Sequence, residues 1–209
     1  MQIRKVNLSD LDKIVNVHKQ CFKNSFSTQL GNKLLKKFYE TYLNQNPDLF
    51  FAAEEETIVG FCMGYLCTDA NLTKRLIKNN LVLFTLRCLL LTVIFNKQMW
   101  GKLFSIFKKK NNDFEIINKE FSAVKQHQVA DLLSICVVDT FRGKGASSAL
   151  VDVFFEKLKE KGFSYCILSV DPENSRAISF YKKKGFTIYK KSKECLVLKN
   201  DLINKEVLM

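Results

Sequence analysis

At 209 residues, with 47% hydrophobic and 26% charged residues, the chain has the size and composition of one globular domain that buries its own core. Its net charge of +12 comes from 28 Lys and only 5 Arg, and no nucleic-acid-binding motif is present, so we expect no nucleic-acid partner. The seven cysteines never form CxxC and residues 1–20 carry charge throughout, which indicates reduced thiols, no export signal and a cytoplasmic protein.

The N-terminal part of the chain predicts a strand, two helices and a hairpin. Residues 2–6 form a short strand, and Ser9 is the expected N-cap of a helix whose apolar residues have helical spacing. A second helix covers roughly residues 33–43, and the polar linker 23–31 between the helices is a loop that could face a ligand. Residues 48–67 predict two strands around an acidic turn.

Residues 72–110 interrupt this pattern with nine basic and no acidic side chains. Their centre, residues 81–95, is apolar all round but too short for a membrane span, which needs about 20 residues. We expect a helical insert that covers part of the domain as a lid. A homodimer contact and peripheral contact with an anionic membrane surface are the alternatives.

The remaining sequence predicts alternating strands and helices. The expected elements are, in chain order, a strand over 129–139, an amphipathic helix over 147–161, a strand over 163–170, a helix beginning at Asn174, and a strand pair over 187–191 and 194–200.

The stretch FRGKGASSAL (141–150) joins the first of these strands to the amphipathic helix. A strand that runs into a glycine-containing loop and a helix presents unpaired backbone N–H groups where the helix dipole favours an anion. Gly143 and Gly145 allow the loop to approach a pyrophosphate closely. The spacing fits neither a P-loop nor a Rossmann loop. The alternative is an ordinary glycine-rich turn.

Two stretches resemble motifs of the GNAT superfamily of acetyl-CoA-dependent N-acyltransferases. Residues 132–150 resemble its motif A, with core [QR]xxGx[GA], and residues 174–186 resemble its NxxAxxFYxxxGF segment. The resemblance implies a single α/β domain over 1–209, with a mixed, mostly antiparallel sheet flanked by helices. It also implies acetyl-CoA as co-substrate, and no metal is expected.

The resemblance further implies where acetyl-CoA binds. The strand before the loop would be splayed from its neighbour, so that backbone groups of Ile135, Cys136 and Val137 pair with the pantetheine arm. The residues implied to hold the pyrophosphate are Arg142, Gly143, Lys144, Gly145, Ala146 and Ser147, of which Ser147 departs from the Gly or Ala of the motif. Asn174 matches a pantetheine-contacting position and is equally a good helix N-cap.

Two residues are candidates for catalysis. Tyr181, in the FYxxxGF segment, matches the residue that protonates the leaving thiolate in many members, with core packing as the alternative. Asp131 is the candidate base, because strand alternation places residues 131, 133 and 135 on one face. Its alternative is a plain aspartate at the start of a strand, with water taking the amine proton.

We therefore expect an acetyl-CoA-dependent N-acetyltransferase that acts by direct attack on a small-molecule primary amine, such as an amino sugar or a nucleotide-linked amino sugar. The alternatives are a protein or peptide N-acetyltransferase, and a non-catalytic acyl-CoA-binding or membrane-surface module. Residues 72–110 would help to select the acceptor. If they contact lipid, the protein would lie peripherally at the inner membrane surface.

Overall fold

The computed structural model describes residues 1–23, 25–66, 129–192 and 195–202. The insert expected at 72–110 lies outside these residues. The strands are β1 (Gln2–Lys5), β2 (Phe50–Glu54), β3 (Ile58–Leu66), β4 (Val129–Val137), β5 (Tyr165–Val170), β6 (Thr187–Lys191) and β7 (Leu196–Asp201). The helices are α1 (Leu11–Cys21), α2 (Phe26–Gln29), α3 (Asn32–Gln45), α7 (Ala146–Glu160) and α8 (Ser175–Lys183), with 3-10 turns η1 (Leu8–Asp10), η2 (Pro47–Leu49) and η5 (Asp139–Phe141).

These strands form one sheet in the order β1-β2-β3-β4-β5-β7-β6. The β4–β5 pair is parallel, and every other pair among the described strands is antiparallel. The expected mixed, mostly antiparallel α/β fold is therefore confirmed. A parallel neighbour in such a sheet requires a crossover, which α7 supplies between β4 and β5.

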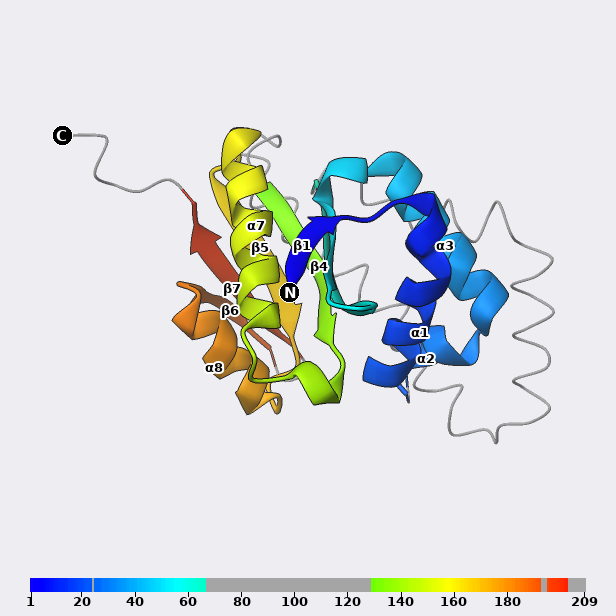
Figure 1. The fold of residues 1–209 in the computed structure, drawn as a ribbon. Helices are drawn as coiled ribbons and strands as arrows, with labels where there is room; N and C mark the ends of the chain where they lie inside the picture. Colours follow the sequence, from blue (N-terminus) through cyan, green and yellow to red (C-terminus); the bar gives the residue numbers. More distant parts are fainter. Residues whose placement is uncertain (24, 67–128, 193–194, 203–209) are drawn as a thin grey trace.

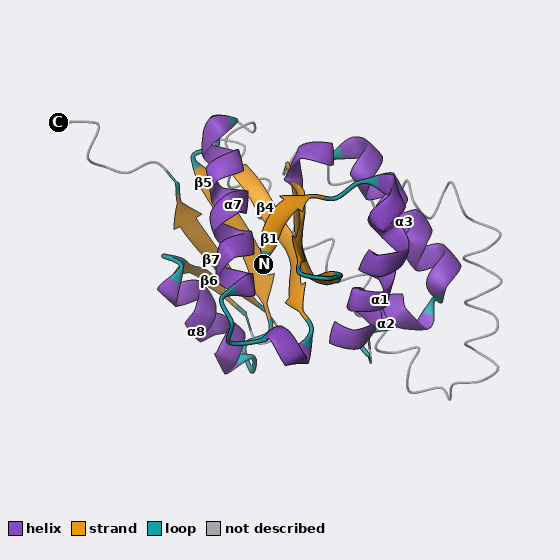
Figure 2. Cartoon of the chain, viewed as in Figure 1, coloured by secondary structure: helices purple, strands orange, loops and turns teal. Residues whose placement is uncertain are grey.

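Helices cover both faces of the sheet (Figures 1 and 2), with α1 and α3 on one side and α7 and α8 on the other. On the first face, the ring of Tyr39 from α3 lies 5.5 Å from that of Phe61. On the second face, a Cβ added to Gly64 would lie 2.3 Å from the ring of Phe154 in α7. Residues that are an odd number apart on a strand lie on opposite faces of the sheet, and Phe61 and Gly64 of β3 follow this rule.

The start of the first helix differs from the sequence expectation. The 3-10 turn η1 precedes α1, and Asn7, not Ser9, is the N-cap of this turn: its side chain accepts the N–H of Ser9, while Asp10 accepts the N–H of Asn7 in a capping box. Arg4 of β1 donates to Asp10 at 2.7 Å and to Glu54 of β2 at 2.5 Å. This ion pair holds the turn against the sheet, a long-range contact that the local sequence does not reveal.

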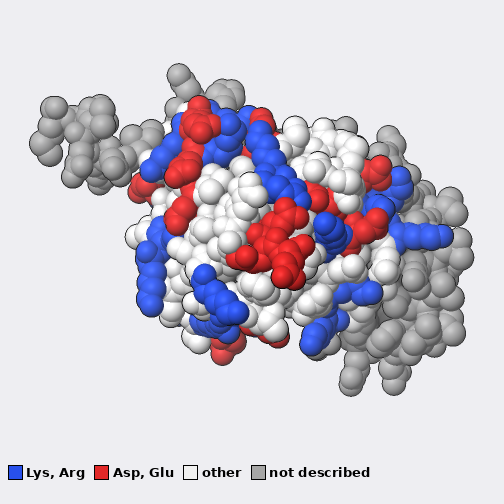
Figure 3. All heavy atoms as spheres, viewed as in Figure 1, with Lys and Arg blue, Asp and Glu red and all other residues white. Residues whose placement is uncertain are grey.

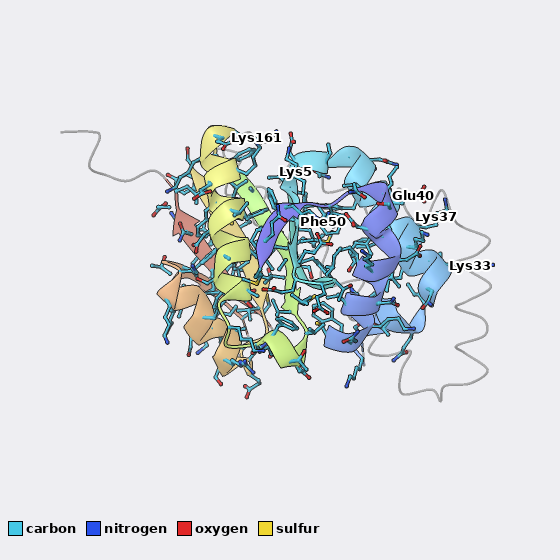
Figure 4. The ribbon with its side chains drawn as sticks, in the orientation of Figure 1. Lys5, Lys33, Lys37, Glu40, Phe50 and Lys161 are labelled. Atoms are coloured by element: carbon cyan, nitrogen blue, oxygen red, sulfur yellow. The ribbon has the colours of Figure 1, made fainter. Side chains whose placement is uncertain are left out.

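Acidic and basic side chains alternate over much of the face shown in Figure 3. One exposed network joins elements distant in sequence: Asp48 accepts from Lys161, after α7, at 2.7 Å and from Lys5 of β1 at 2.6 Å. Figure 4 labels the two lysines. Lys161 and then Lys5 hold the pKa of Asp48 below its ordinary value. These contacts fix the far end of α7, whose other end begins at the glycine loop.

Candidate functional site

Strands β4 and β5 separate part of the way along their length. They pair only at Val129–Tyr165, Ala130–Cys166 and Asp131–Ile167, although β4 continues to Val137. Beyond Asp131, no strand of the described residues lies beside the edge of β4 that faces β5. We call this segment the open edge of β4.

The pairing of β4 with β3 decides which backbone groups face the open edge. Val138 donates its N–H to the carbonyl of Val59 at 2.9 Å, so Cys136, two residues earlier, also directs its backbone groups toward β3. Ile135 and Val137 direct theirs toward the open edge. The prediction that the main chain of Cys136 is free for a ligand is therefore corrected, because strand alternation leaves only its two neighbours available.

The open edge leads directly to the glycine loop. Gly143 and Gly145 have φ of 80° and 86°, and a Cβ at either would meet no atom of the described residues within 4 Å. Glycine is therefore needed there for its left-handed backbone and not because a described neighbour would collide with a side chain. Gly145 is the N-cap of α7 and no side chain caps the helix, whose first backbone bond runs from Ala149 N–H to Gly145 C=O at 2.9 Å. The N–H groups of the first turn, at residues 146–148, lack helical partners.

Two exposed cations flank this helix terminus. Arg142 forms an ion pair with Asp139 and donates from Nε to the carbonyl of Val137 at 3.2 Å. The Lys144 ammonium lies 4.8 Å from the centre of the Phe141 ring. Three features of this terminus fit a pyrophosphate: the N-terminus of α7 has no side-chain cap, the two glycines are left-handed, and two cations lie beside them. The open edge of β4 fits a different part of a ligand, a chain that carries amide groups.

The second motif positions Tyr181 and Asn174 through α8. Asn174 caps the helix, and its Oδ1 accepts the N–H of Ala177 at 3.1 Å, so the capping role considered from the sequence is present. The Tyr181 ring packs edge-on against Phe186 at 5.6 Å. Burial, with smaller contributions from nearby groups that include Asp131, raises the pKa of Tyr181 above its ordinary value. Its phenol is therefore protonated at neutral pH and can act as a proton donor.

Asp131 is buried at 5% exposure, but it does not share a face with Ile135. Tyr65 lies opposite Asp131 and Met63 opposite Ser134, so Gly64 alone faces two residues of β4. Because of this β-bulge, the residues of β4 before and after it follow opposite patterns of alternation between the two faces of the sheet. Asp131 consequently lies on the face of α1 and α3, whereas Ile135 lies on the face of α7 and α8. The alternation argument for Asp131 is wrong for that reason.

The sequence alone did not lead us to predict a buried polar network near the linker 23–31. His18 of α1 is 7% exposed, and its Nδ1 lies 2.6 Å from the Tyr39 hydroxyl while its Nε2 lies 3.0 Å from Ser27 Oγ. Ser25 continues the network to Thr28, which donates to a backbone carbonyl. His18 occupies the apolar face of α1, three residues after Val15, and this position is the feature of the sequence that could have indicated a buried histidine.

The described residues contain neither a metal-binding cluster nor a membrane-spanning helix. No group of three or more His, Cys, Asp or Glu side chains among them is arranged to hold a metal ion. None of the helices in the described ranges is long and apolar enough to cross a membrane.

Residues 108–186 match the model of the Acetyltransferase (GNAT) family. This agrees with the resemblance carried by the two motifs.

Sequence relatives match a limited part of the chain. An uncharacterized N-acetyltransferase of Methanocaldococcus jannaschii is 38% identical over 65 residues, which are 31% of this chain and 29% of that protein. N-alpha-acetyltransferase 30 of Schizosaccharomyces pombe is 30% identical over 57 residues, which are 27% of this chain and 38% of that protein. The matches thus span less than half the length of either relative.

The fold is similar over nearly the whole chain to that of a solved structure. PaiA N-acetyltransferase from Thermoplasma acidophilum, crystallised in complex with coenzyme A, superposes with a TM-score of 0.57 at 16% identity. The superposition covers 96% of this chain and 98% of that one. At this level of sequence identity, the superposition shows that the two proteins share a fold and nothing more.

Proposed function

We propose that this protein is an acetyl-CoA-dependent N-acetyltransferase that acts by direct attack of a primary amine on the thioester. The observation that carries the proposal is the open edge of β4, which runs into the uncapped, cation-flanked N-terminus of α7. The match of residues 108–186 to the Acetyltransferase (GNAT) family model and the coenzyme A complex of a protein with a similar fold support this proposal.

Different groups of the chain would bind different parts of acetyl-CoA. Backbone groups of Ile135 and Val137 would pair with the amides of the pantetheine arm, as a neighbouring strand would. The N–H groups of residues 143–147 would hold the pyrophosphate, with Arg142 and Lys144 supplying positive charge. Arg142 would leave the carbonyl of Val137, freeing that acceptor for the arm.

Acetyl transfer needs an amine that has lost its proton and an acid for the departing sulfur. The bound thioester would supply the acetyl group. Tyr181, protonated at neutral pH, would donate to the sulfur. Water would take the amine proton, and Asp131, which lies on the face of α1 and α3 and not on that of Ile135, is the residue whose part in this step the pH profile tests. The contributions of acid and base differ, because the acid acts on the leaving group and the base on the acceptor.

We further propose that the acceptor is a small-molecule amine such as an amino sugar or a nucleotide-linked amino sugar. A protein or peptide N-terminus is the second candidate, favoured by the similarity to N-alpha-acetyltransferase 30 of S. pombe. The insert 72–110 would contribute to this choice. Its basic composition also motivates the hypotheses of a homodimer contact and of peripheral membrane contact, which co-sedimentation with anionic vesicles at low and high salt would test.

A thiol-release assay with the full-length protein and acetyl-CoA tests the activity. Amino sugars, nucleotide-linked amino sugars, polyamines, amino acids and peptides would each be offered as acceptor. We expect amine-dependent release of coenzyme A with one of the small-molecule classes. Release with peptides alone would support the second candidate. Acetyl-CoA binding without release for any amine would instead indicate an acyl-CoA-binding module.

A further inference from the structure

The side chain of Arg142 folds back onto the strand that leads to the glycine loop. The 3-10 turn η5 reverses the chain between the end of β4 and the start of α7 (Figure 1). In this turn, the N–H of Phe141 donates to the carbonyl of Val138 at 3.0 Å. Arg142 therefore lies beside Val137, five residues earlier, and donates from Nε to its carbonyl at 3.2 Å.

This contact supplies a hydrogen bond that a neighbouring strand would normally make. Val137 is 3% exposed, and its carbonyl faces the open edge, where no strand of the described ranges lies beside β4. Because a buried backbone carbonyl needs a donor, Arg142 takes the place of a strand partner. Its guanidinium also forms an ion pair through Nη1 with Asp139, the first residue of η5. The last acceptor of the open edge is therefore occupied by the chain itself.

The two contacts of Arg142 also engage the donors that a phosphate would use. A guanidinium binds a phosphate in a bidentate manner through Nε and one Nη, or through its two Nη atoms. Nε donates to Val137 and Nη1 pairs with Asp139, so each of these two donor pairs has one member engaged. A bidentate contact with a pyrophosphate consequently requires Arg142 to leave at least one of its present partners.

We propose that Arg142 is a specificity gate that favours acyl thioesters carrying a pyrophosphate, as acyl-CoA does. A pyrophosphate draws the guanidinium away from Val137 and Asp139, and the carbonyl of Val137 then accepts an amide N–H of the pantetheine arm. An acyl-pantetheine without phosphates leaves this carbonyl occupied. Asp139 is a positioning residue, because it acts through Arg142. The proposal rests on the proposed function, since it concerns the same ligand and the same open edge.

Calorimetric titration with two thioesters tests the gate. The full-length protein is titrated with acetyl-CoA and with acetyl-pantetheine, which has the same arm but neither phosphates nor nucleotide. Arg142→Ala removes a cation from the pyrophosphate and uncovers the carbonyl of Val137. We expect this variant to bind acetyl-CoA about tenfold more weakly than the wild type but acetyl-pantetheine about threefold more tightly. A damaged fold would weaken both ligands.

Lys144→Ala is the matched control for Arg142→Ala. The Lys144 ammonium also flanks the N-terminus of α7, but it lies over the Phe141 ring instead of on the open edge. We expect Lys144→Ala to weaken the binding of acetyl-CoA and to leave that of acetyl-pantetheine unchanged. Tighter binding of acetyl-pantetheine to both variants would contradict the specific role of Arg142.

A double-mutant cycle tests the role of Asp139. Asp139→Asn releases Arg142 from its ion pair, so we expect it to tighten acetyl-CoA binding by about threefold. The same substitution in the Arg142→Ala background should have no effect. An equal gain in both backgrounds would show that the charge of Asp139 acts directly on the ligand, and its positioning role would be wrong.

The contact of Arg142 with Val137 has a readout that needs no ligand. In nitrogen-15 correlation spectra, the Nε–H signal of Arg142 is assigned by its loss in Arg142→Ala. We expect its exchange with water to be about tenfold slower than that of Arg176, which is exposed on α8. Equal exchange rates would overturn the proposal.

The titrations distinguish failure of the gate from failure of the proposed function. Acetyl-pantetheine that binds Arg142→Ala no more tightly than the wild type, undetectable binding to both included, would overturn the gate while acetyl-CoA binding leaves the proposed function intact. Absence of acetyl-CoA binding to the wild type would instead contradict the proposed function.

Discussion

At the scale of single residues, the proposed chemistry depends on a phenol that keeps its proton. Burial raises the pKa of Tyr181, so the Tyr181 hydroxyl is available as a donor throughout the neutral range. We expect Tyr181→Phe to lower kcat by about 100-fold with little change in the affinity for acetyl-CoA. Steady-state kinetics would measure both effects, with Tyr189→Phe on β6 as the matched control. A wild-type kcat for Tyr181→Phe would assign this ring to packing against Phe186 alone.

Asp131 can be tested through the pH profile of the reaction. A base must be ionised to accept a proton, so activity that depends on Asp131 falls when acid protonates its carboxylate. Asp131→Asn removes that group, and we expect lower kcat/KM together with an altered acidic limb of the profile. An acidic limb identical to that of the wild type would leave water as the proton acceptor.

At the scale of elements, the packing of α1 on α3 depends on a neutral histidine. Burial lowers the pKa of His18 to about 4, whereas an unfolded histidine has a pKa of about 6.5. The unfolded chain therefore binds more protons, and stability present above pH 6.5 is lost as the pH falls toward 4. We expect the free energy of unfolding to decrease by about 2 kcal/mol between pH 7 and pH 5.

Denaturant titration at these two pH values measures this difference, with most carboxyl groups still ionised at pH 5. His18→Gln serves as the comparison, because it removes the titrating ring while keeping a polar side chain. The variant should be less stable than the wild type at pH 7 but lose less stability at pH 5. An equal loss in both proteins would show that His18 is not the responsible group.

Gly64 fixes the spacing between β3, the bulge in β4 and α7. A Cβ at this position would lie 2.3 Å from the Phe154 ring and 2.5 Å from the backbone carbonyl of Asp131. We expect Gly64→Ala to reduce the free energy of unfolding by about 3 kcal/mol, because ring and backbone must both move. Gly162→Ala, with positive φ but nothing within 4 Å, should cost about 1 kcal/mol. Equal denaturation midpoints for the two variants would contradict this role of Gly64.

The elements differ in how far their sequences determine them. The hairpin at 48–67 and the helix that follows Gly145 were predictable, because alternation, amphipathic spacing and glycine position act within a few residues. The cap at Asn7 depends on Arg4 and Glu54, which the local sequence does not connect. The bulge depends on the register between β3 and β4, although an isolated Gly64 within a strand was a usable signal.

At the scale of the whole molecule, the site depends on two parts of the sheet that the chain connects through α7. The separation of β4 from β5 provides the open edge, and the crossover helix begins where that edge ends. The glycine motif made the loop predictable from sequence. The assignment of individual β4 residues required the register, since one inserted residue exchanges the two faces of a strand. The register therefore directs the backbone groups of Ile135 and Val137 toward the open edge and those of Cys136 toward β3.

Calorimetric titration of acetyl-CoA into three forms of the full-length protein tests the central claim most directly. Gly145→Asp places a carboxylate at the N-terminus of α7, whereas Gly162→Asp introduces the same side chain at a similar φ, 76° against 86°, after the end of that helix. We predict that the wild type and Gly162→Asp bind acetyl-CoA with similar Kd, and that Gly145→Asp shows no detectable binding while remaining folded by circular dichroism. Unchanged affinity in folded Gly145→Asp would contradict the assignment of this loop to the pyrophosphate.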